Sequence, residues 1–469
     1  MNHVREILLI VCLLLQGCTN APQRRLASAE KQLSTDGETT MLYHSVLYYP
    51  DELSLRFDGY LIGVEKSPRD LVSTPQSVKV STPSEKTLKT STDALLNQPK
   101  LLYISHILRE QAQPQSAENH TCALYNLYQR LEPAQSQLVE PCAEQNMLPM
   151  AVTQRRCQDK EVCGYDDSWD ALKLLKQNMI QRLVTQANTG KPYSDIVVIV
   201  MGWNTVQEEA IRNFNSIMLN VKRSAPADFN PLVIGVTWPS QWSSSWIEPI
   251  YRLTSFPTKA GDADELGLSW LGVLIQQTLP EVKAALPQAQ QAQLTTSLIG
   301  HSFGSRASNV AACFGPAIYQ DHYQPPTAGI DNLINLQGAF KLTQLTDNAT
   351  STSATVFCPL VKQVALTASI NDQAMSKAPG GGYAGDARSY ADTCSNTNTL
   401  IRCTFADHHG NLFGVSGSAR SNITYIDASS LISENAYLSG GGAHSDIYRK
   451  EHGRLIYQLM RQGKTPPLD

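Results

Sequence analysis

A serine stands at the centre of the pattern Gly-X-Ser-X-Gly in residues 300–304. An apolar, strand-like run ends just before it, and a helical pattern begins just after it. A serine hydroxyl is unreactive at neutral pH until a base takes its proton, and a sharp turn between a strand and a helix is one way to present it. Gly300 and Gly304 suit such a turn because its backbone is strained and its neighbours approach closely. The pattern therefore predicts that Ser302 is a nucleophile.

An acid and a base for this serine are expected after later strands of the same sheet, because parallel strands gather reactive groups at their carboxyl ends. Asp372 follows the apolar run 364–368, and His444 follows the last predicted strand and the glycines at 440–442. The order Ser302, Asp372, His444 is typical of one class of serine hydrolases. We predict these three residues as nucleophile, acid and base, with a helix cap as the structural alternative for Asp372.

Other residues compete for these roles. Asp427 lies at the end of the last predicted strand and is a rival acid. His408 and His409 precede that strand, and His301 adjoins the nucleophile, where the turn is expected to direct its side chain elsewhere. Asp407, His408 and His409 could instead touch a metal ion, but such a loop cluster is more often solvated surface. The sequence predicts no metal site.

Hydrogen-bond donors are also needed where a carbonyl oxygen becomes negative, and backbone amides can serve. One predicted donor is the amide of Phe303, directly after the nucleophile. The other is the amide of Trp203, in the loop 202–205 that follows the predicted strand 196–201. Gly202 would allow the backbone to approach a substrate closely.

The pattern of apolar residues predicts a doubly wound, mainly parallel α/β sheet. Trp169, Leu172, Leu175, Met179 and Leu183 recur at helical spacing, with a cap at residues 166–168 and a stop at Gly190. Several apolar runs lack the alternation of a half-exposed strand, and helix-length segments separate them, as expected for buried parallel strands. The predicted strands are 196–201, 232–237, 294–299, 333–336, 364–367 and 423–426.

The first residues resemble a secretory signal. Arg5 precedes the apolar run Ile7 to Leu15, which is too short to span a membrane. Leu15-Gln16-Gly17-Cys18 resembles the lipobox of bacterial lipoproteins, which implies removal of residues 1–17 and lipid attachment to Cys18; an ordinary signal peptide is the alternative. Thr19 replaces the aspartate that favours inner-membrane retention, so the resemblance points to the outer membrane of a bacterial cell envelope.

The predicted organisation after the signal has three parts. Residues 18–40 are polar and predicted as a tether, residues 41–165 as a cysteine-containing region of unknown fold or an elaboration of the main domain, and residues 166–469 as the α/β domain. The formal net charge of −4 provides no basic field for nucleic acid.

Ten cysteines become eight if Cys12 is removed with the signal and Cys18 carries lipid. An even number in an exported chain favours disulfides, although zinc binding is an alternative. Near neighbours give a plausible set of four pairs: Cys122 with Cys142, Cys157 with Cys163, Cys313 with Cys358, and Cys394 with Cys403.

Five motifs lie in order along the chain: Met201-Gly202-Trp203-Asn204, Val236-Thr237-Trp238-Pro239-Ser240, Gly300-His301-Ser302-Phe303-Gly304-Ser305, Ser369-Ile370-Asn371-Asp372 and Ala443-His444-Ser445-Asp446. Through these motifs, residues 168–460 resemble the α/β-hydrolase superfamily, and within it a bacterial group of esterase-like members of unknown function. The resemblance departs at Met201, where the group usually has a histidine that supports the loop of amide donors.

The resemblance implies acyl transfer from a small-molecule or lipid ester, without a cofactor. Ser302 would attack the ester, His444 would accept its proton, Asp372 would hold the imidazole, and the amides of Phe303 and Trp203 would stabilise the oxyanion. Two alternatives remain open at this point: an amidase or thioesterase with the same triad, and a non-catalytic envelope lipoprotein that retains the fold.

Overall fold

The computed structural model describes part of the chain, and all structural statements below refer to that part. The described residues are 54–65, 102–112, 120–127, 139, 141–142, 160–202, 207–238, 260–318, 329–346, 358, 360–395, 401–417, 421–434 and 442–462.

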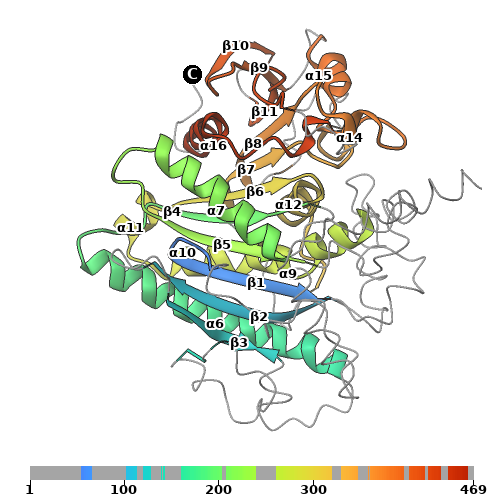
Figure 1. The fold of residues 1–469 in the computed structure, drawn as a ribbon. Helices are drawn as coiled ribbons and strands as arrows, with labels where there is room; N and C mark the ends of the chain where they lie inside the picture. Colours follow the sequence, from blue (N-terminus) through green and yellow to red (C-terminus); the bar gives the residue numbers. More distant parts are fainter. Residues whose placement is uncertain are drawn as a thin grey trace, which may run out of the picture.

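These residues form a mixed α/β structure around one eleven-stranded sheet (Figure 1). The strand order is β10-β9-β11-β8-β7-β6-β4-β5-β1-β2-β3. Pairing is parallel from β9 to β1 and antiparallel for the β9–β10, β1–β2 and β2–β3 pairs at the two edges. The strands are β1 (Gly59–Glu65), β2 (Tyr103–Gln111), β3 (His120–Asn126), β4 (Asp195–Val200), β5 (Pro231–Thr237), β6 (Thr295–His301), β7 (Ile330–Leu336), β8 (Val361–Ala368), β9 (Arg402–Ala406), β10 (Leu412–Gly417) and β11 (Ile423–Asp427).

All six strands predicted from apolar runs are present as β4 to β8 and β11. The predictions missed the edge strands. Strand β10 is mostly exposed, so its residues carry no buried apolar face that a sequence pattern would reveal. Strands β1, β2 and β3 belong to the region 41–165, and they continue the same sheet next to β5.

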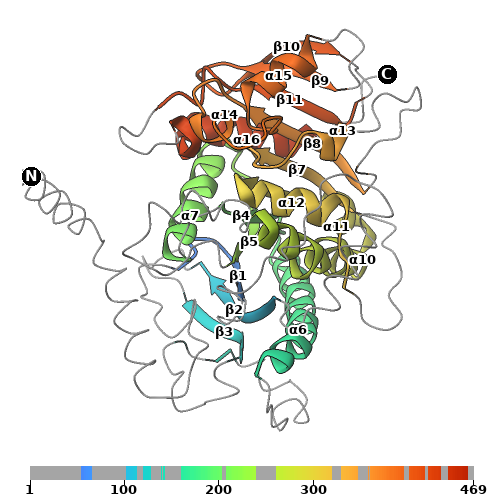
Figure 2. The same ribbon diagram turned by 90° about the vertical axis from the view of Figure 1, so that its right-hand side faces the viewer.

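Helices cover both faces of this sheet. Figure 2 shows α7 on one side and α6, α10 and α12 on the other. Residues 260–268 are also helical, and the stretch from α9 through η4 to α10 is continuous. The helices are α6 (Lys160–Asn188), α7 (Gln207–Ser224), α9 (Trp270–Val273), the π-helix η4 (Leu274–Thr278), α10 (Leu279–Ala284), α11 (Gln288–Gln293), α12 (Phe303–Cys313), α13 (Thr343–Thr346), α14 (Gln373–Ser376), α15 (Ala387–Cys394), the 3-10 helix η5 (Ala443–Ser445) and α16 (Lys450–Gln462).

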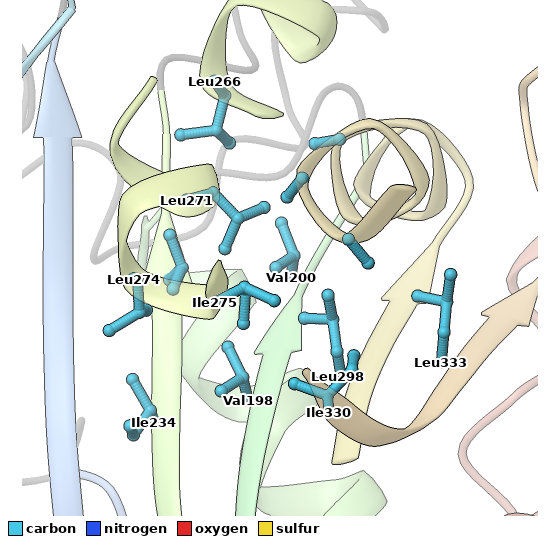
Figure 3. Packing of buried hydrophobic residues seen from close by; sticks show 14 of the residues in the cluster. Val198, Val200, Ile234, Leu266, Leu271, Leu274, Ile275, Leu298, Ile330 and Leu333 are labelled. Carbon is cyan, nitrogen blue, oxygen red and sulfur yellow. The ribbon is translucent and has the colours of Figure 1, made fainter. Parts of the chain in front are cut away.

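The surroundings of β4 explain why apolar and polar residues do not alternate along this strand. Val198 and Val200 pack into the core under α9, η4 and α12, together with Leu298 (Figure 3). Val197 and Ile199 face the opposite side, where α7 and α16 supply Phe214 and other apolar side chains. Because both faces of the strand are buried, every position favours an apolar residue.

The predicted start of the first helix is wrong. Helix α6 begins at Lys160, before the expected cap at residues 166–168. Ser168 is fully buried inside the helix, and its Oγ accepts a hydrogen bond of 2.7 Å from the amide of Ile104 on β2. Ser168, a residue type that is common at helix caps, therefore joins the helix to the sheet.

Three of the four expected disulfides are confirmed: Cys122–Cys142, Cys313–Cys358 and Cys394–Cys403. These six cysteines are therefore not zinc ligands. The fourth expected pair, Cys157–Cys163, lies outside the part of the chain whose side chains are described. Within that part, no helix combines the length and the apolar character that crossing a membrane requires.

Phe214 provides a test of the packing between α7 and the sheet. Its side chain is fully buried, and its Cε2 lies 2.5 Å from the place that a Cβ on Gly235 of β5 would occupy. We expect Phe214→Ala to lower the free energy of unfolding by about 3–5 kcal/mol, because it leaves a cavity that the sheet cannot fill. Denaturant unfolding followed by circular dichroism measures this change.

The matched control is Phe413→Ala on the edge strand β10, where the side chain is 53% exposed. This variant should change the free energy of unfolding by less than about 1 kcal/mol. Equal losses in the two variants would contradict the packing described here.

Candidate functional site

Ser302 lies in the turn between β6 and α12, with backbone angles φ 56° and ψ −121°. A non-glycine residue with positive φ is strained and marks a site where other interactions hold the backbone. Only 7% of Ser302 is exposed, and within the described residues its side chain makes no capping hydrogen bond to α12. The hydroxyl is therefore not committed to the helix that follows it.

The end of β7 holds the backbone of this turn. The amide of Ser302 donates to the carbonyl of Leu336 at 3.0 Å, and the amide of Ala339 donates to the carbonyl of Ser302 at 3.1 Å. The Ser305 hydroxyl donates to the carbonyls of Gly300, at 2.7 Å, and of Leu336, at 3.2 Å. These bonds link the ends of β6 and β7 and stabilise the strained conformation.

Close approach explains the glycines around Ser302. A Cβ on Gly304 would lie 2.1 Å from the carbonyl oxygen of Val200, and one on Gly300 would lie 2.5 Å from the Cα of Ser305. A Cβ on Gly202, just after β4, would lie 2.6 Å from the Cβ of Ser302. Any side chain at these three positions would push the strand, the turn and the helix apart.

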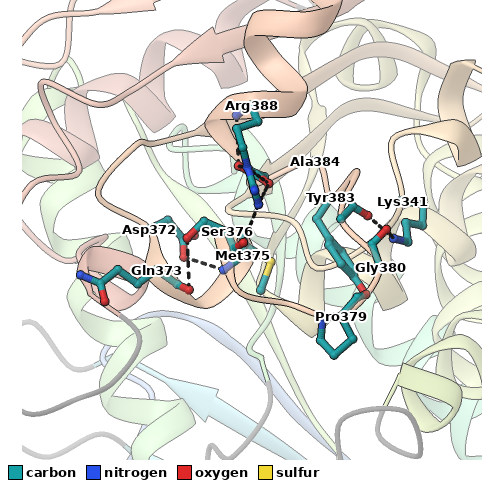
Figure 4. A network of polar contacts seen from close by, with 12 residues as sticks. Lys341, Asp372, Gln373, Met375, Ser376, Pro379, Gly380, Tyr383, Ala384 and Arg388 are labelled. Carbon is teal, nitrogen blue, oxygen red and sulfur yellow. Dashed lines mark hydrogen bonds and ion pairs between the residues drawn. The ribbon is translucent and has the colours of Figure 1, made fainter.

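Asp372 and His444 are paired. The Nδ1 of His444 and the Oδ2 of Asp372 are 2.8 Å apart, and Asp372 is fully buried while the His444 side chain is 14% exposed. The other carboxylate oxygen of Asp372 accepts from the amide of Met375 at 3.0 Å and so caps α14. Figure 4 shows Asp372 at the start of this short helix. One carboxylate thus caps a helix and is hydrogen-bonded to His444.

A short loop contact brings His444 to Asp372 across the sheet edge. Gly442 forms an antiparallel bridge with Asp372, and the amide of Ala443 donates to the carbonyl of Asn371 at 2.9 Å. Gly442 has φ 60°, and a Cβ there would lie 2.5 Å from the carbonyl oxygen of Asn371. The backbone of the histidine loop therefore rests directly on the backbone of the aspartate loop.

His301 connects the histidine loop to the serine turn. It is the last residue of β6, and its ring lies against that of His444 with centroids 4.9 Å apart. Its Nε2 is 2.9 Å from the carbonyl oxygen of His444. Since His301 directly precedes Ser302, this contact brings the imidazole of His444 and the serine turn to the same sheet edge. Within the described residues, hydrogen bonds join His444 to Asp372 and to His301, and none joins it to the Ser302 hydroxyl. Proton transfer from the hydroxyl requires the imidazole to come within hydrogen-bond reach of it.

The rival residues have other partners. The Oδ1 of Asp427 accepts from the amide and the hydroxyl of Ser429 in its own turn. The carboxylate of Asp407 accepts from the amides of His409 and Asn411 in the turn between β9 and β10. His408 and His409 are exposed in this turn. The two rival carboxylates, Asp407 and Asp427, therefore each stabilise a local turn.

The predicted amide donors are described only in part. Phe303 is the first residue of α12, so its amide belongs to the first turn of the helix, where the helix dipole favours negative charge. Trp203 lies outside the described residues, as does the predicted lipid site Cys18. Gly202, which precedes Trp203, is described and touches the serine turn as set out above.

Two charged groups next to the site were not predicted. Arg306, one turn after Ser302, forms a buried bidentate ion pair with Asp264, with both N–O distances 2.7 Å. Lys341 follows the loop that holds Ser302; its Nζ donates to the carbonyl of Gly380 at 2.6 Å and lies 4.3 Å from the ring centre of Tyr383 (Figure 4). Burial and the charge of Arg306 lower the pKa of Lys341. No sequence motif joins these residues, because their partners are distant along the chain.

Comparison with known proteins identifies no family for this chain. No known family matches it, and no curated protein does. Among solved structures, it is similar to an uncharacterized protein from Pseudomonas aeruginosa, with 10% sequence identity and a TM-score of 0.24. The match covers 65% of this chain and 50% of that protein, so the chain spans about half of its length.

The ion pair between Arg306 and Asp264 gives a test of how α12 is held. We expect Arg306→Ala to lower the free energy of unfolding by about 3–5 kcal/mol, because it removes the guanidinium partner of a fully buried carboxylate. A double variant, Arg306→Met with Asp264→Leu, replaces both charges with apolar side chains. It should recover most of this loss in the free energy of unfolding. Denaturant unfolding measures both.

Lys176→Ala is the control, because its ion pair with Glu281 is much more exposed, with side chains 32% and 42% exposed. This variant should cost less than about 1 kcal/mol. A loss as large as that of Arg306→Ala would mean that burial does not determine the strength of these pairs.

Proposed function

We propose that this chain is a serine hydrolase of α/β-hydrolase type that cleaves carboxylic esters through an acyl-enzyme. The observation that carries the proposal is the hydrogen bond between His444 and buried Asp372, at the same sheet edge as Ser302 in its left-handed turn. An acid that orients a histidine next to a strained serine is the arrangement that activates a hydroxyl. The order of the three residues along the chain agrees with this class.

In the proposed reaction, Asp372 accepts a hydrogen bond from the Nδ1–H of His444 and so leaves the lone pair on Nε2. This nitrogen takes the proton of Ser302 while the Oγ bonds to the ester carbon. His444 then gives the proton to the departing alcohol, which leaves an acyl group on Ser302. Water attacks this acyl group by the same sequence, releases the carboxylic acid and returns the proton to Ser302.

The amides of Phe303 and Trp203 are the proposed donors to the oxyanion. The position of Phe303 at the start of α12 supports its part, and the contact of Gly202 with Ser302 supports the approach of the loop after β4. Stabilisation by such fixed donors is often worth several kcal/mol. The reaction requires no cofactor.

We further propose that the enzyme is exported and held at the bacterial envelope, in the outer membrane, by lipid on Cys18. The run Leu15-Gln16-Gly17-Cys18 after an apolar stretch supports this. The three disulfides support an oxidising compartment.

Ser302→Ala tests the nucleophile. Wild-type protein should react covalently with a fluorophosphonate at Ser302 and hydrolyse p-nitrophenyl esters, and Ser302→Ala should lose labelling and at least about 10⁴-fold of the hydrolysis rate. Ser416→Ala, which removes an exposed serine on the edge strand β10, should behave as wild type. Unlabelled, inactive wild-type protein with intact disulfides would exclude the proposal and favour a non-catalytic lipoprotein.

A panel of matched esters, thioesters and amides then identifies the bond that is cleaved. The proposal expects the highest kcat/KM for the ester with each acyl group. A higher value for the thioester or the amide would replace the esterase assignment with the corresponding alternative.

Gly202→Ala tests the packing of the loop after β4 against Ser302. The added Cβ would lie 2.6 Å from the Cβ of Ser302 and 2.9 Å from the carbonyl oxygen of His301, so the turn must shift. We expect the rate of fluorophosphonate labelling to fall about 10- to 100-fold, since displacements near 1 Å cost this much. The control is Gly190→Asn, because Gly190 has φ 78° and no atom within 4 Å of an added Cβ. Unchanged labelling of Gly202→Ala would contradict the described geometry.

Cys18→Ser tests the anchor. Wild-type protein expressed in a bacterium should incorporate a palmitate analogue and sediment with membranes, and Cys18→Ser should lose both. Incorporation that persists in Cys18→Ser would assign the lipid to another residue.

A further inference from the structure

His301 is a buried titratable residue that the proposed reaction does not use. The residue is 6% exposed, and its ring lies between the serine turn and the histidine loop. Its Nε2 is 2.9 Å from the main-chain oxygen of His444, and the two rings are 4.9 Å apart and tilted by 40°. His301 thus touches the imidazole that the proposed mechanism needs and the backbone that carries it.

The partner of His301 fixes the position of its proton. A carbonyl oxygen only accepts hydrogen bonds, so the Nε2 of His301 carries a hydrogen and donates it to His444. Burial, with a smaller contribution from the charge of His444, lowers the pKa of His301 to about 3. The ring is therefore neutral in the range where an esterase works, and the donor is always present.

His444 is held from two sides as a result. Its Nδ1 is bonded to Asp372 on the loop after β8, and its carbonyl oxygen accepts from His301 on β6. The first bond alone allows the imidazole to swing about the carboxylate. The second bond and the ring contact restrict that movement from the strand that leads into Ser302.

We propose that His301 is a positioning residue that holds the base His444 in register with the nucleophile Ser302. This role rests on the proposed function. It joins the two catalytic residues through one side chain: His301 is covalently linked to Ser302 and hydrogen-bonded to the backbone of His444.

The test compares His301→Leu with His301→Gln. Leucine removes the donor, whereas the Nε2 of glutamine can replace the histidine Nε2–H as donor to the carbonyl oxygen. We expect His301→Leu to lower kcat and the rate of fluorophosphonate labelling about 10- to 100-fold, with KM within about threefold of wild type. His301→Gln should retain both rates within about threefold. His408→Leu, at an exposed histidine, should match wild type.

Two results would overturn this role. One is a His301→Leu protein that reacts at the wild-type rate. The other is an equal loss in His301→Leu and His301→Gln, which would assign the effect to packing and not to the hydrogen bond. Thermal unfolding of all variants shows whether a slow variant is folded.

A readout independent of activity separates this proposal from the function on which it rests. The proton between His444 and Asp372 should give a low-field resonance in the NMR spectrum, assigned by its loss in Asp372→Ala. We expect this resonance in wild type and His301→Gln, and its broadening or loss in folded His301→Leu. Absence of labelling in wild type would overturn the proposed function, while persistence of the resonance in His301→Leu would overturn the role of His301.

Discussion

The left-handed turn at Ser302 is the constraint on which the rest of the site depends. Such a backbone conformation costs about 1–3 kcal/mol for a residue with a side chain, so its surroundings must hold it. Leu336 at the end of β7 bonds to the amide of Ser302, and Ala339 in the loop after β7 bonds to its carbonyl. Gly202, just after β4, and Gly304 on α12 allow the approach that these bonds need, because a Cβ on either would collide with the neighbouring backbone or side chain.

The sheet makes this turn possible because its central strands are parallel and buried on both faces. Parallel pairing brings the carboxyl ends of β4, β6, β7 and β8 to one edge, so loops far apart in sequence meet there. The edge strands differ. Strands β1 to β3 extend the sheet beside β5, and the β9–β10 pair extends it beyond β11. These additions widen the sheet without interrupting the central strands that position Ser302, Asp372 and His444.

Sequence patterns predicted the features that depend on residues close together in the chain. Continuous apolar runs identified β4 to β8 and β11, and the glycines around Ser302 indicated close approach. The positions of Asp372 and His444 after their strands indicated that the two residues meet, and their side chains are hydrogen-bonded. The start of α6 was missed because Ser168 bonds across to β2. The contact of His301 with His444 was missed because it depends on how the loop 442–445 folds back, which no local pattern encodes.

Asp372 shows how one side chain links local structure to the site. One carboxylate oxygen accepts the amide of Met375 and begins α14, and the other faces the Nδ1 of His444. Because the two oxygens are fixed in one plane, the first turn of the short helix sets the direction from which the imidazole is held. The antiparallel bridge between Asp372 and Gly442 fixes the backbone on the opposite side of this pair. The orientation of His444 thus follows from backbone hydrogen bonds, and the buried carboxylate transmits that orientation to the ring.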